Sequence, residues 1–236
     1  MVESKAWDWK MVQGAGQDYW HAPPPDAYYL AHRWQLQSRK SIFDLGTGLG
    51  RYAVFFARLG FDVSALDLSE ESIKRAKEYA TSEGLKIDFK TGDMLKLPYA
   101  DGSFDCITCV NVISHTDTAG VRKARAEVRR VLKPGGEIYF TLCSKLTWGW
   151  QQDHPKVDEN TKIRMDEGPE KGVPHFYADE DLIPELTKGF KIVQMEHSLY
   201  YRQADLPEGS YSPTLKQLGL THGGWHFHIL MSKNER

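Results

Sequence analysis

Short apolar runs and longer amphipathic stretches alternate along the chain from about Ser41 onward. The apolar runs predict buried strands over residues 42–45, 61–66, 87–90, 104–110 and 138–142. Between these runs, apolar residues recur at helical spacing and predict helices over residues 51–59, 69–84 and 121–131. Strands that alternate with helices indicate a parallel sheet with right-handed crossovers.

Polar residues and glycines mark where several of these elements begin and end. Ser69 is expected to cap a helix whose first turn carries two glutamates, where the helix dipole favours them. Gly60 and Gly84 suit left-handed helix ends. Asp26 follows a triple proline and is expected to cap a helix that runs to about residue 37. Residues 133–136, Lys-Pro-Gly-Gly, are expected to form a turn.

The two ends of this pattern differ from its centre. Residues 1–40 are aromatic and irregular at first, and we expect them to form an N-terminal helical cap. The pattern lapses over residues 144–178, which is long for a structureless loop and suggests an insertion or lid. Asp179 is then expected to cap a helix to about residue 188, before strands over 190–200 and 225–231. We therefore expect one domain over residues 41–236 after the cap.

Composition narrows the class of protein. The 236 residues include 41% hydrophobic and 26% charged residues, which excludes a disordered chain. A formal net charge of -2 argues against a dedicated nucleic-acid binder. The longest apolar run, residues 52–57, is far shorter than the roughly 20 residues of a membrane span. With three cysteines and no signal-like start, the expectation is a soluble, reduced, cytoplasmic protein of undetermined oligomeric state.

A glycine-rich segment, Asp44-Leu45-Gly46-Thr47-Gly48-Leu49-Gly50, lies between the first predicted strand and its helix. Glycines there allow a tight turn and let a ligand approach the backbone closely. The dinucleotide fingerprint G-x-G-x-x-G/A needs a small residue at its sixth place, where this chain has Arg51. The spacing therefore disfavours NAD. Residues 44–50 instead fit completely an alternative pattern, acid-x-G-x-G-x-G, in which three alternating glycines follow an acidic residue.

Two more acids follow predicted strands. Asp67 ends the second strand, where a carboxylate can accept both hydroxyl protons of a ribose. Asp93 follows the third strand, where an acid beside a backbone N–H would suit the amino edge of an adenine. Three sites in this order, at strand ends, favour a nucleoside cofactor over a purely structural interpretation.

With these residues the chain resembles the class I S-adenosylmethionine-dependent methyltransferases. More narrowly, it is similar to their small-molecule branch, which contains ubiquinone-biosynthesis-type enzymes. The resemblance lies in DLGTGLG (44–50), ALDLS (65–69), GDMLKLPYADGSFD (92–105) and RRVLKPGGEIYFT (129–141). It implies a Rossmann-like, doubly wound α/β sheet of seven strands in the order 3-2-1-4-5-7-6, with strand 7 antiparallel and an insertion after strand 5.

The resemblance also implies a cofactor site for S-adenosylmethionine, whose demethylated product is S-adenosylhomocysteine. Its implied members are, for the methionine end, Asp44, Gly46, Thr47, Gly48 and Gly50; for the ribose, Asp67; for the adenine, Leu68, Asp93 and Met94; and for the methionine amine, the backbone of Asn111.

The acceptor side is marked by aromatic residues. All seven tryptophans lie outside residues 35–147: Trp7, Trp9, Trp20, Trp34, Trp148, Trp150 and Trp225. One hypothesis is an acceptor pocket with aromatic walls, suited to an apolar, aromatic or cationic small molecule. Its predicted substrate-binding residues are Trp20, Trp148, His175 and Tyr200. The alternative is that the tryptophans hold the cap and the insertion on the core.

Two histidines are candidate catalytic or positioning residues. His115 follows the end of the central fourth strand, next to the expected donor methyl group. His226 begins the last, antiparallel strand at the ligand end of the sheet. No metal site is expected, because the spacing of the histidines does not establish three or four convergent ligands. Cys106 and Cys109 lie on a buried strand and face opposite sides, which favours packing.

The function expected from these observations is transfer of a methyl group from S-adenosylmethionine to a small molecule. Alternatives are an RNA methyltransferase and a non-catalytic S-adenosylmethionine-binding protein, while Arg51 argues against an NAD-dependent oxidoreductase. Neither the acceptor nor its nucleophilic atom follows from the sequence.

Overall fold

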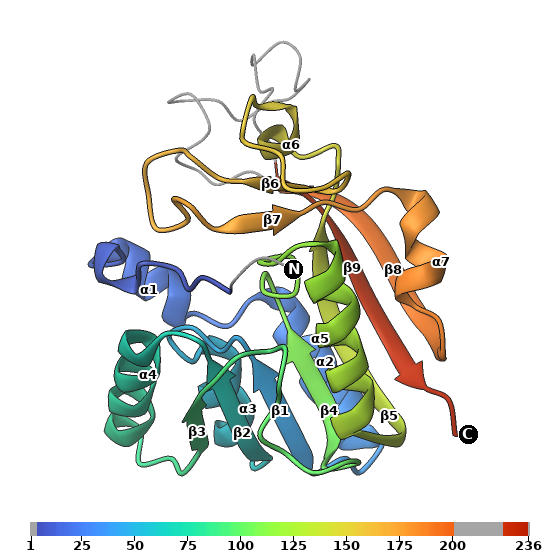
Figure 1. Ribbon diagram of the computed structural model, residues 1–236. Coiled ribbons are helices and arrows are strands. Elements are labelled where there is room, and N and C mark those ends of the chain that lie inside the picture. The colour runs from blue at the N-terminus through green and yellow to red at the C-terminus, as the bar shows by residue number, and fades with distance from the viewer. Residues whose placement is uncertain (1–3, 201–223, 236) are drawn as a thin grey trace, which may run out of the picture.

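Seven strands form the central sheet, in the order β3-β2-β1-β4-β5-β9-β8 (Figure 1). The computed structural model describes residues 4–200 and 224–235. The strands are β1 (Ser41–Leu45), β2 (Asp62–Asp67), β3 (Asp88–Thr91), β4 (Phe104–Cys109), β5 (Leu132–Cys143), β8 (Phe190–Tyr200) and β9 (Gly224–Lys233). The first five run parallel, and β9 pairs antiparallel with both β5 and β8. This confirms the predicted strand order, since β6 and β7 belong to a separate hairpin.

Helices cover both faces of the sheet. On one face, apolar residues of α2 (Pro25–Leu36) and α3 (Arg51–Arg58) pack on the strands in a cluster that includes Cys106. On the other, α5 (Thr118–Val131) and α7 (Ile183–Leu186) pack in a cluster that includes Cys109. The two cysteines therefore face opposite sides, as strand geometry predicts. The helix α4 (Glu70–Ser82) lies beside β3 and β2 at the sheet edge (Figure 1).

Two of the three predicted N-caps, at Ser69 and Asp179, are present, and the one at Asp26 is not. The Ser69 hydroxyl accepts a hydrogen bond from the backbone N–H of Ser72, which starts α4 as predicted. The expected cap at Asp26 is wrong, because α2 begins at Pro25, before Asp26, and the proline has no N–H that would need an acceptor. The Asp26 carboxylate instead accepts hydrogen bonds from the hydroxyls of Tyr52 and Tyr139, at 2.7 and 2.6 Å.

Two further predictions need correction. Residues 133–136 are not a separate turn but a bulge within β5, because the pairing steps from Phe104 opposite Leu132 to Cys106 opposite Glu137. The helix expected over 179–188 is a 3-10 turn, η2 (Glu180–Leu182), followed by the single turn α7. Asp179 does accept a hydrogen bond from the Leu182 N–H, so the predicted cap is present.

The segment 144–178 carries its own small structure above the sheet (Figure 1). It contains α6 (Trp148–Gln151) and the antiparallel pair β6 (Thr161–Ile163) and β7 (Pro174–Phe176). Its ends meet where Ser144 pairs with Ala178. The N–H of Phe176 donates to the carbonyl of Ser114, so the hairpin sits over the carboxyl end of β4.

The N-terminal segment contributes a 3-10 turn, η1 (Trp9–Met11), and the helix α1 (Ala15–His21). It lies on the same side of the sheet as the hairpin, since the N–H of Asp8 donates to the carbonyl of Pro169. No helix in the described ranges is long and apolar enough to cross a bilayer.

Candidate functional site

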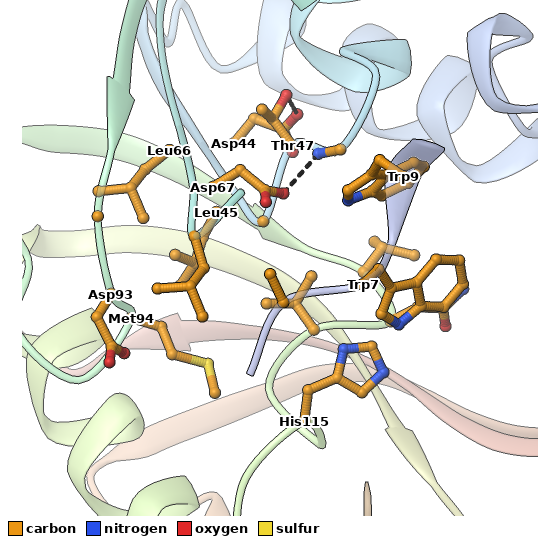
Figure 2. A pocket seen from close by; sticks show the side chains of 18 of the residues that line it. Trp7, Trp9, Asp44, Leu45, Thr47, Leu66, Asp67, Asp93, Met94 and His115 are labelled. Atoms are coloured by element: carbon orange, nitrogen blue, oxygen red, sulfur yellow. Dashed lines mark hydrogen bonds between the residues drawn. The ribbon is translucent and has the colours of Figure 1, made fainter. Parts of the chain in front are cut away.

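A cavity, part of it open to solvent, lies at the carboxyl ends of β1, β2 and β4 (Figure 2). Open α/β sheets bind ligands at this edge. The residues that line it come from these strand ends, from the loops that follow them and from the N-terminal segment: Ser4, Lys5, Ala6, Trp7, Trp9, Trp20, Asp44, Leu45, Gly46, Thr47, Gly48, Arg51, Tyr52, Leu66, Asp67, Leu68, Gly92, Asp93, Met94, Val110, Asn111, Val112 and His115.

The glycine loop after β1 has no room for side chains. Gly46 and Gly48 have φ of +71° and +54°, which favour glycine. A Cβ on Gly46 would lie 2.1 Å from Val112 Cγ2, and one on Gly48 would lie 2.8 Å from the ring of Trp9. The backbone N–H groups of Gly46 and Thr47 both donate to the Leu66 carbonyl, which ties the loop to β2. The loop is therefore packed between Val112 and Trp9, and neither glycine could carry a side chain without displacing one of them.

Asp44 supports this loop from beneath. Its carboxylate is buried and accepts hydrogen bonds from the hydroxyls of Thr47 and Thr108, both at 2.7 Å. Burial raises the pKa of Asp44, although these two hydroxyls act in the opposite direction. Thr108 was not a predicted site residue; the signal for it in the sequence is a single threonine near the end of a mostly apolar strand.

Asp67 ends β2 and faces the cavity (Figure 2). One carboxylate oxygen accepts from the backbone N–H of Gly48 and the other from that of Ser69, each at 2.9 Å. Burial raises the pKa of Asp67, against the effect of these backbone donors. A carboxylate oxygen can accept more than one hydrogen bond, which is the capacity that a pair of ribose hydroxyls needs.

The loop after β3 forms the wall beside Asp67. Asp93 accepts a hydrogen bond from the backbone N–H of Leu95 at 2.8 Å, which orients its carboxylate. Met94 is buried with 8% of its surface exposed, whereas Leu68 is 36% exposed. These two side chains supply an apolar slot between the two acids.

Asn111 follows β4 and has a φ of +58°, uncommon for a residue other than glycine. Its backbone N–H donates to the hydroxyl of Thr141 at 2.8 Å, and that hydroxyl donates to the Asn111 side-chain oxygen at 3.0 Å. This exchange with β5 holds the residue in its left-handed conformation at the cavity wall.

The N-terminal segment, which was expected to form a cap, closes the cavity from above. Trp7, Trp9 and Trp20 contact one another, with ring centroids 5.3 to 5.6 Å apart. Arg75 of α4 anchors the segment by donating to the carbonyls of Trp9 and Val12 and to the side-chain oxygen of Gln17, at 2.6 to 2.8 Å. This strap, residues 4–12, covers the glycine loop.

Two buried polar atoms in the strap lack a partner. The Ser4 hydroxyl and the Trp7 indole N–H line the cavity and have no hydrogen-bond partner among the described residues. Buried polar groups in native proteins are normally satisfied, so these two atoms mark positions where a bound molecule would supply the missing partners.

The structure brings most of the predicted cofactor residues together. Asp44, Gly46, Thr47, Gly48, Asp67, Leu68, Asp93, Met94 and Asn111 all line the cavity. Gly50 does not; it precedes α3 with a φ of +90°, and its role is to turn the chain into that helix. Arg51, the first residue of α3, is buried at the cavity wall with its guanidinium 4.4 Å from the centroid of the Trp20 ring.

The predicted acceptor-side residues do not all line one cavity. His115 and Trp20 line the cavity. His226 lies instead in a neighbouring groove that shares Arg51 and Asn111 with the cavity. Its Nε2 lies 3.5 Å from the Cys143 sulfur, and burial lowers the pKa of His226 to about 4. The side chain of Tyr200 lies outside the described part of the structure.

Trp148 and His175 do not line the cavity. Trp148 is in α6, where the guanidinium of Arg164 lies 5.7 Å from its ring centroid. His175 is buried in β7 behind His115, with the two ring centroids 4.7 Å apart. Burial, and to a lesser degree His175, lower the pKa of His115 to about 3.

Of the seven tryptophans considered for an acceptor pocket with aromatic walls, four do not line this cavity. Three line the cavity, but Trp34 is in the core and donates to the Glu137 carboxylate at 3.0 Å. Trp148 and Trp150 belong to the 144–178 segment and Trp225 to β9, and none of the three lines the cavity. Tryptophan position in the sequence did not distinguish a wall residue from a core residue.

Comparisons with known proteins agree with this site. Residues 42–136 match the family model described as a methyltransferase domain. The chain is 30% identical over 187 residues to sterol 24-C-methyltransferase ERG6B of Gibberella zeae, a match that covers 77% of this chain and 47% of that one. It is 30% identical to a ubiquinone biosynthesis O-methyltransferase of Escherichia coli, over 63% of this chain and 60% of that one. The chain thus spans about half the length of these curated relatives.

Solved structures show the same fold. A SAM-dependent methyltransferase of Methanosarcina mazei superposes with a TM-score of 0.69 at 22% identity, over 91% of this chain and 100% of that one. The [4+2]-cyclase SpnF superposes with a TM-score of 0.64 at 19% identity, over 99% of this chain and 87% of that one. The chain contains a methyltransferase domain with the class I fold, which confirms the resemblance carried by its motifs.

Proposed function

We propose that this protein transfers a methyl group from S-adenosylmethionine to a small-molecule acceptor. The observation that supports this most is the convergence of Asp44, the glycine loop, Asp67 and Asp93 on one cavity. Neither the fold nor a match over part of the chain names the reaction, since the same fold occurs in a protein described as a cyclase.

The residues around the cavity fit the parts of this cofactor. Asp67 would accept the two ribose hydroxyls with its remaining lone pairs, while Leu68 and Met94 would contact the adenine. The glycine loop would lie against the methionine end, because the glycines themselves place no side chain between the backbone and the cavity. When bound, the cofactor supplies an electrophilic methyl group on a sulfonium.

The protein's own contribution is alignment and the exclusion of water. Holding two reactants in line can lower a barrier by up to about 7–11 kcal/mol. The strap, with Trp7 and Trp9 above the glycine loop, would cover the reactants, and Trp20 would present an aromatic face. His115 would contact the acceptor with a neutral ring, because burial lowers its pKa to about 3. So weak a base would orient the acceptor rather than take its proton at pH 7.

The side chains that line the cavity support a proposal for the class of acceptor. Three tryptophans and an apolar slot suit an aromatic or apolar small molecule. The names of the relatives, a sterol methyltransferase and a ubiquinone-biosynthesis O-methyltransferase, agree with that class. We therefore place sterols and hydroxylated aromatic compounds first in an acceptor screen.

Ligand-dependent thermal unfolding tests the cofactor. A ligand at 100 times its dissociation constant adds about 2.7 kcal/mol to stability, or roughly 5–10 °C in midpoint for a domain of this size. We expect this shift with S-adenosylmethionine and S-adenosylhomocysteine and none with NAD. A shift with NAD alone would overturn the proposal. It would also overturn the argument that Arg51 disfavours NAD because dinucleotide-binding loops have a small residue at that position.

Labelled methyl transfer then tests the acceptor. We expect turnover with a member of the screen and at least tenfold slower turnover in His115→Ala. Full activity of that variant would remove His115 from the mechanism. Transfer to RNA, with affinity that falls steeply as salt rises, would favour an RNA methyltransferase instead. Cofactor binding with no transfer to any acceptor class would favour a non-catalytic binding protein.

A further inference from the structure

Three side chains that can bind metals converge between the cavity and the hairpin of the 144–178 segment. They are His115, from the loop after β4, His175 of β7 and Glu170, which precedes β7. One ligand atom from each lies within 4.8 Å of the other two. Glu170 was not a predicted site residue, and no spacing or motif in the sequence connects it with His115.

The orientation of His175 leaves a lone pair pointed at a carboxylate. Its Nδ1 lies 3.0 Å from the backbone carbonyl of Val173, and a carbonyl only accepts, so the Nδ1 carries the proton. In the neutral ring the other nitrogen, Nε2, then bears a lone pair. That nitrogen lies 3.6 Å from Oε1 of Glu170, so two acceptors face each other and need a positively charged species between them.

The separation of these two atoms suits a metal ion better than a shared proton. A charged hydrogen bond between nitrogen and carboxylate oxygen spans about 2.7–2.9 Å. Ligands at about 2.1 Å from a tetrahedral zinc ion lie roughly 3.4 Å apart. The 3.6 Å between His175 and Glu170 is close to the second value, and a backbone carbonyl that fixes the ring is the usual partner of a metal-binding histidine.

The surroundings of His115, the third candidate ligand, and the charge of the neighbouring side chains also favour a metal ion at this position. No described residue makes a hydrogen bond with the ring nitrogens of His115, which faces His175 with its centroid 4.7 Å away. The other oxygen of Glu170 pairs with Arg164 at 3.1 Å, and Arg164 also pairs with Asp166 at 2.8 Å. Glu170 and Asp166 carry two negative charges and Arg164 carries one positive charge, so these three side chains together leave a net negative charge beside the imidazole rings.

From this geometry we propose that His115, Glu170 and His175 form a binding site for a divalent transition-metal ion of the zinc type. Two histidines and one carboxylate, with a position left for a further ligand, are a known donor set for zinc. Since His115 lines the cavity, the ion would lie at its wall. If the proposed methyl transfer is correct, an acceptor oxygen, nitrogen or sulfur would find a Lewis acid there.

Metal uptake tests the site directly. The full-length, tag-free protein is stripped with a chelator, dialysed against Zn²⁺ and analysed by mass spectrometry for bound metal. We expect about one ion per chain, and at least tenfold weaker binding in Glu170→Gln and in His175→Gln. His32→Gln, which removes an exposed histidine of α2, is the matched control and should bind as the wild type does.

Cobalt substitution identifies the ligands. The Co²⁺ form should show visible d–d bands without the thiolate charge-transfer absorption that a Cys143 ligand would give. Cys143→Ser should leave metal binding unchanged, although the Cys143 sulfur lies 3.5 Å from His226. A thiolate band, or loss of binding in Cys143→Ser, would overturn the ligand assignment. So would uptake that is absent in the wild type or unchanged in both ligand variants.

A thermal shift with S-adenosylhomocysteine, measured on the same samples, shows that each variant is folded. It also separates the two proposals. Zinc uptake with no response to the adenosyl compound would support the metal site and overturn the proposed function. A response to the adenosyl compound with no zinc uptake would support the proposed function and overturn the metal site.

Discussion

The backbone N–H of Gly48 donates to the carboxylate of Asp67 across 2.9 Å, joining the loop after β1 to the end of β2. One side chain therefore both arranges the glycine loop and presents free lone pairs to the cavity. The hydrogen bond explains why an acid at the end of β2 accompanies a glycine loop after β1. The acid fixes the position of the loop backbone, and the loop N–H orients the carboxylate.

Replacing Asp67 tests this double role. In Asp67→Asn, one of the two oxygens becomes an amide nitrogen that cannot accept, so the backbone contact with Gly48 or Ser69 is lost together with one ribose contact. We expect S-adenosylhomocysteine to bind at least tenfold more weakly, measured by titration calorimetry. Asp62→Asn changes the exposed first residue of the same strand and should bind normally. Equal affinity of both variants would contradict the role given to Asp67.

Gly46 is required for two separable reasons, its φ of +71° and the proximity of Val112. Gly84→Ala measures the first alone, because Gly84 has a φ of +68° and open space around it. We expect Gly84→Ala to cost about 1–2 kcal/mol in the free energy of unfolding by urea. Gly46→Ala should cost clearly more, and adding Val112→Ala should recover part of the difference. Equal costs at the two glycines would mean that Val112 moves aside freely.

Arg75 should control how firmly the strap covers the cavity. Arg75→Met removes the donors to Trp9, Val12 and Gln17, and the strap contains an exposed tryptic site at Lys10. We expect cleavage after Lys10 to become about tenfold faster or more, since charged hydrogen bonds contribute about 1.5–3 kcal/mol each. Arg58→Met, which removes an exposed ion pair with Glu83, is the control. Unchanged cleavage in Arg75→Met would show that the tryptophan contacts alone hold the strap.

Glu137 should make stability depend on acid pH. Its carboxylate accepts from Arg33, at 2.9 and 2.7 Å, and from the Trp34 indole. Burial acts to raise the pKa of Glu137, but these donors outweigh it and the pKa lies below the ordinary value of 4.5. The carboxylate therefore contributes stability above pH 4.5, and the contribution is lost as pH falls through the lowered pKa.

The variant Glu137→Gln isolates that contribution. At pH 7 we expect it to unfold with about 2 kcal/mol less free energy than the wild type. The difference should shrink below pH 4.5, where the wild-type carboxylate also loses its charge. Urea unfolding at several pH values provides the measurement, and a difference that stays constant with pH would exclude Glu137 as its source.

The local pattern predicted a parallel sheet, and the resemblance carried by the motifs implied its strand order. Nine of the cofactor residues that the resemblance implied line the cavity. The reason is geometric: the carboxyl ends of parallel strands meet at one edge, so Asp44, Asp67 and Asn111 converge once their strands are recognised. The glycine loop carries its own signature, because its φ angles and the close approach of Val112 exclude other residues. These features depend on residues within or next to a strand.

Only the tertiary structure decided what faces the cavity from outside the sheet. The strap meets α4 through Arg75, and Glu170 meets His115, across long stretches of chain with no shared periodicity. The same is true of the tryptophans: Trp34 is buried against Glu137 while Trp7 lines the cavity, although the sequence marks both alike. Contacts of this kind arise from how irregular segments pack, and packing depends on the shape of the completed core rather than on local sequence.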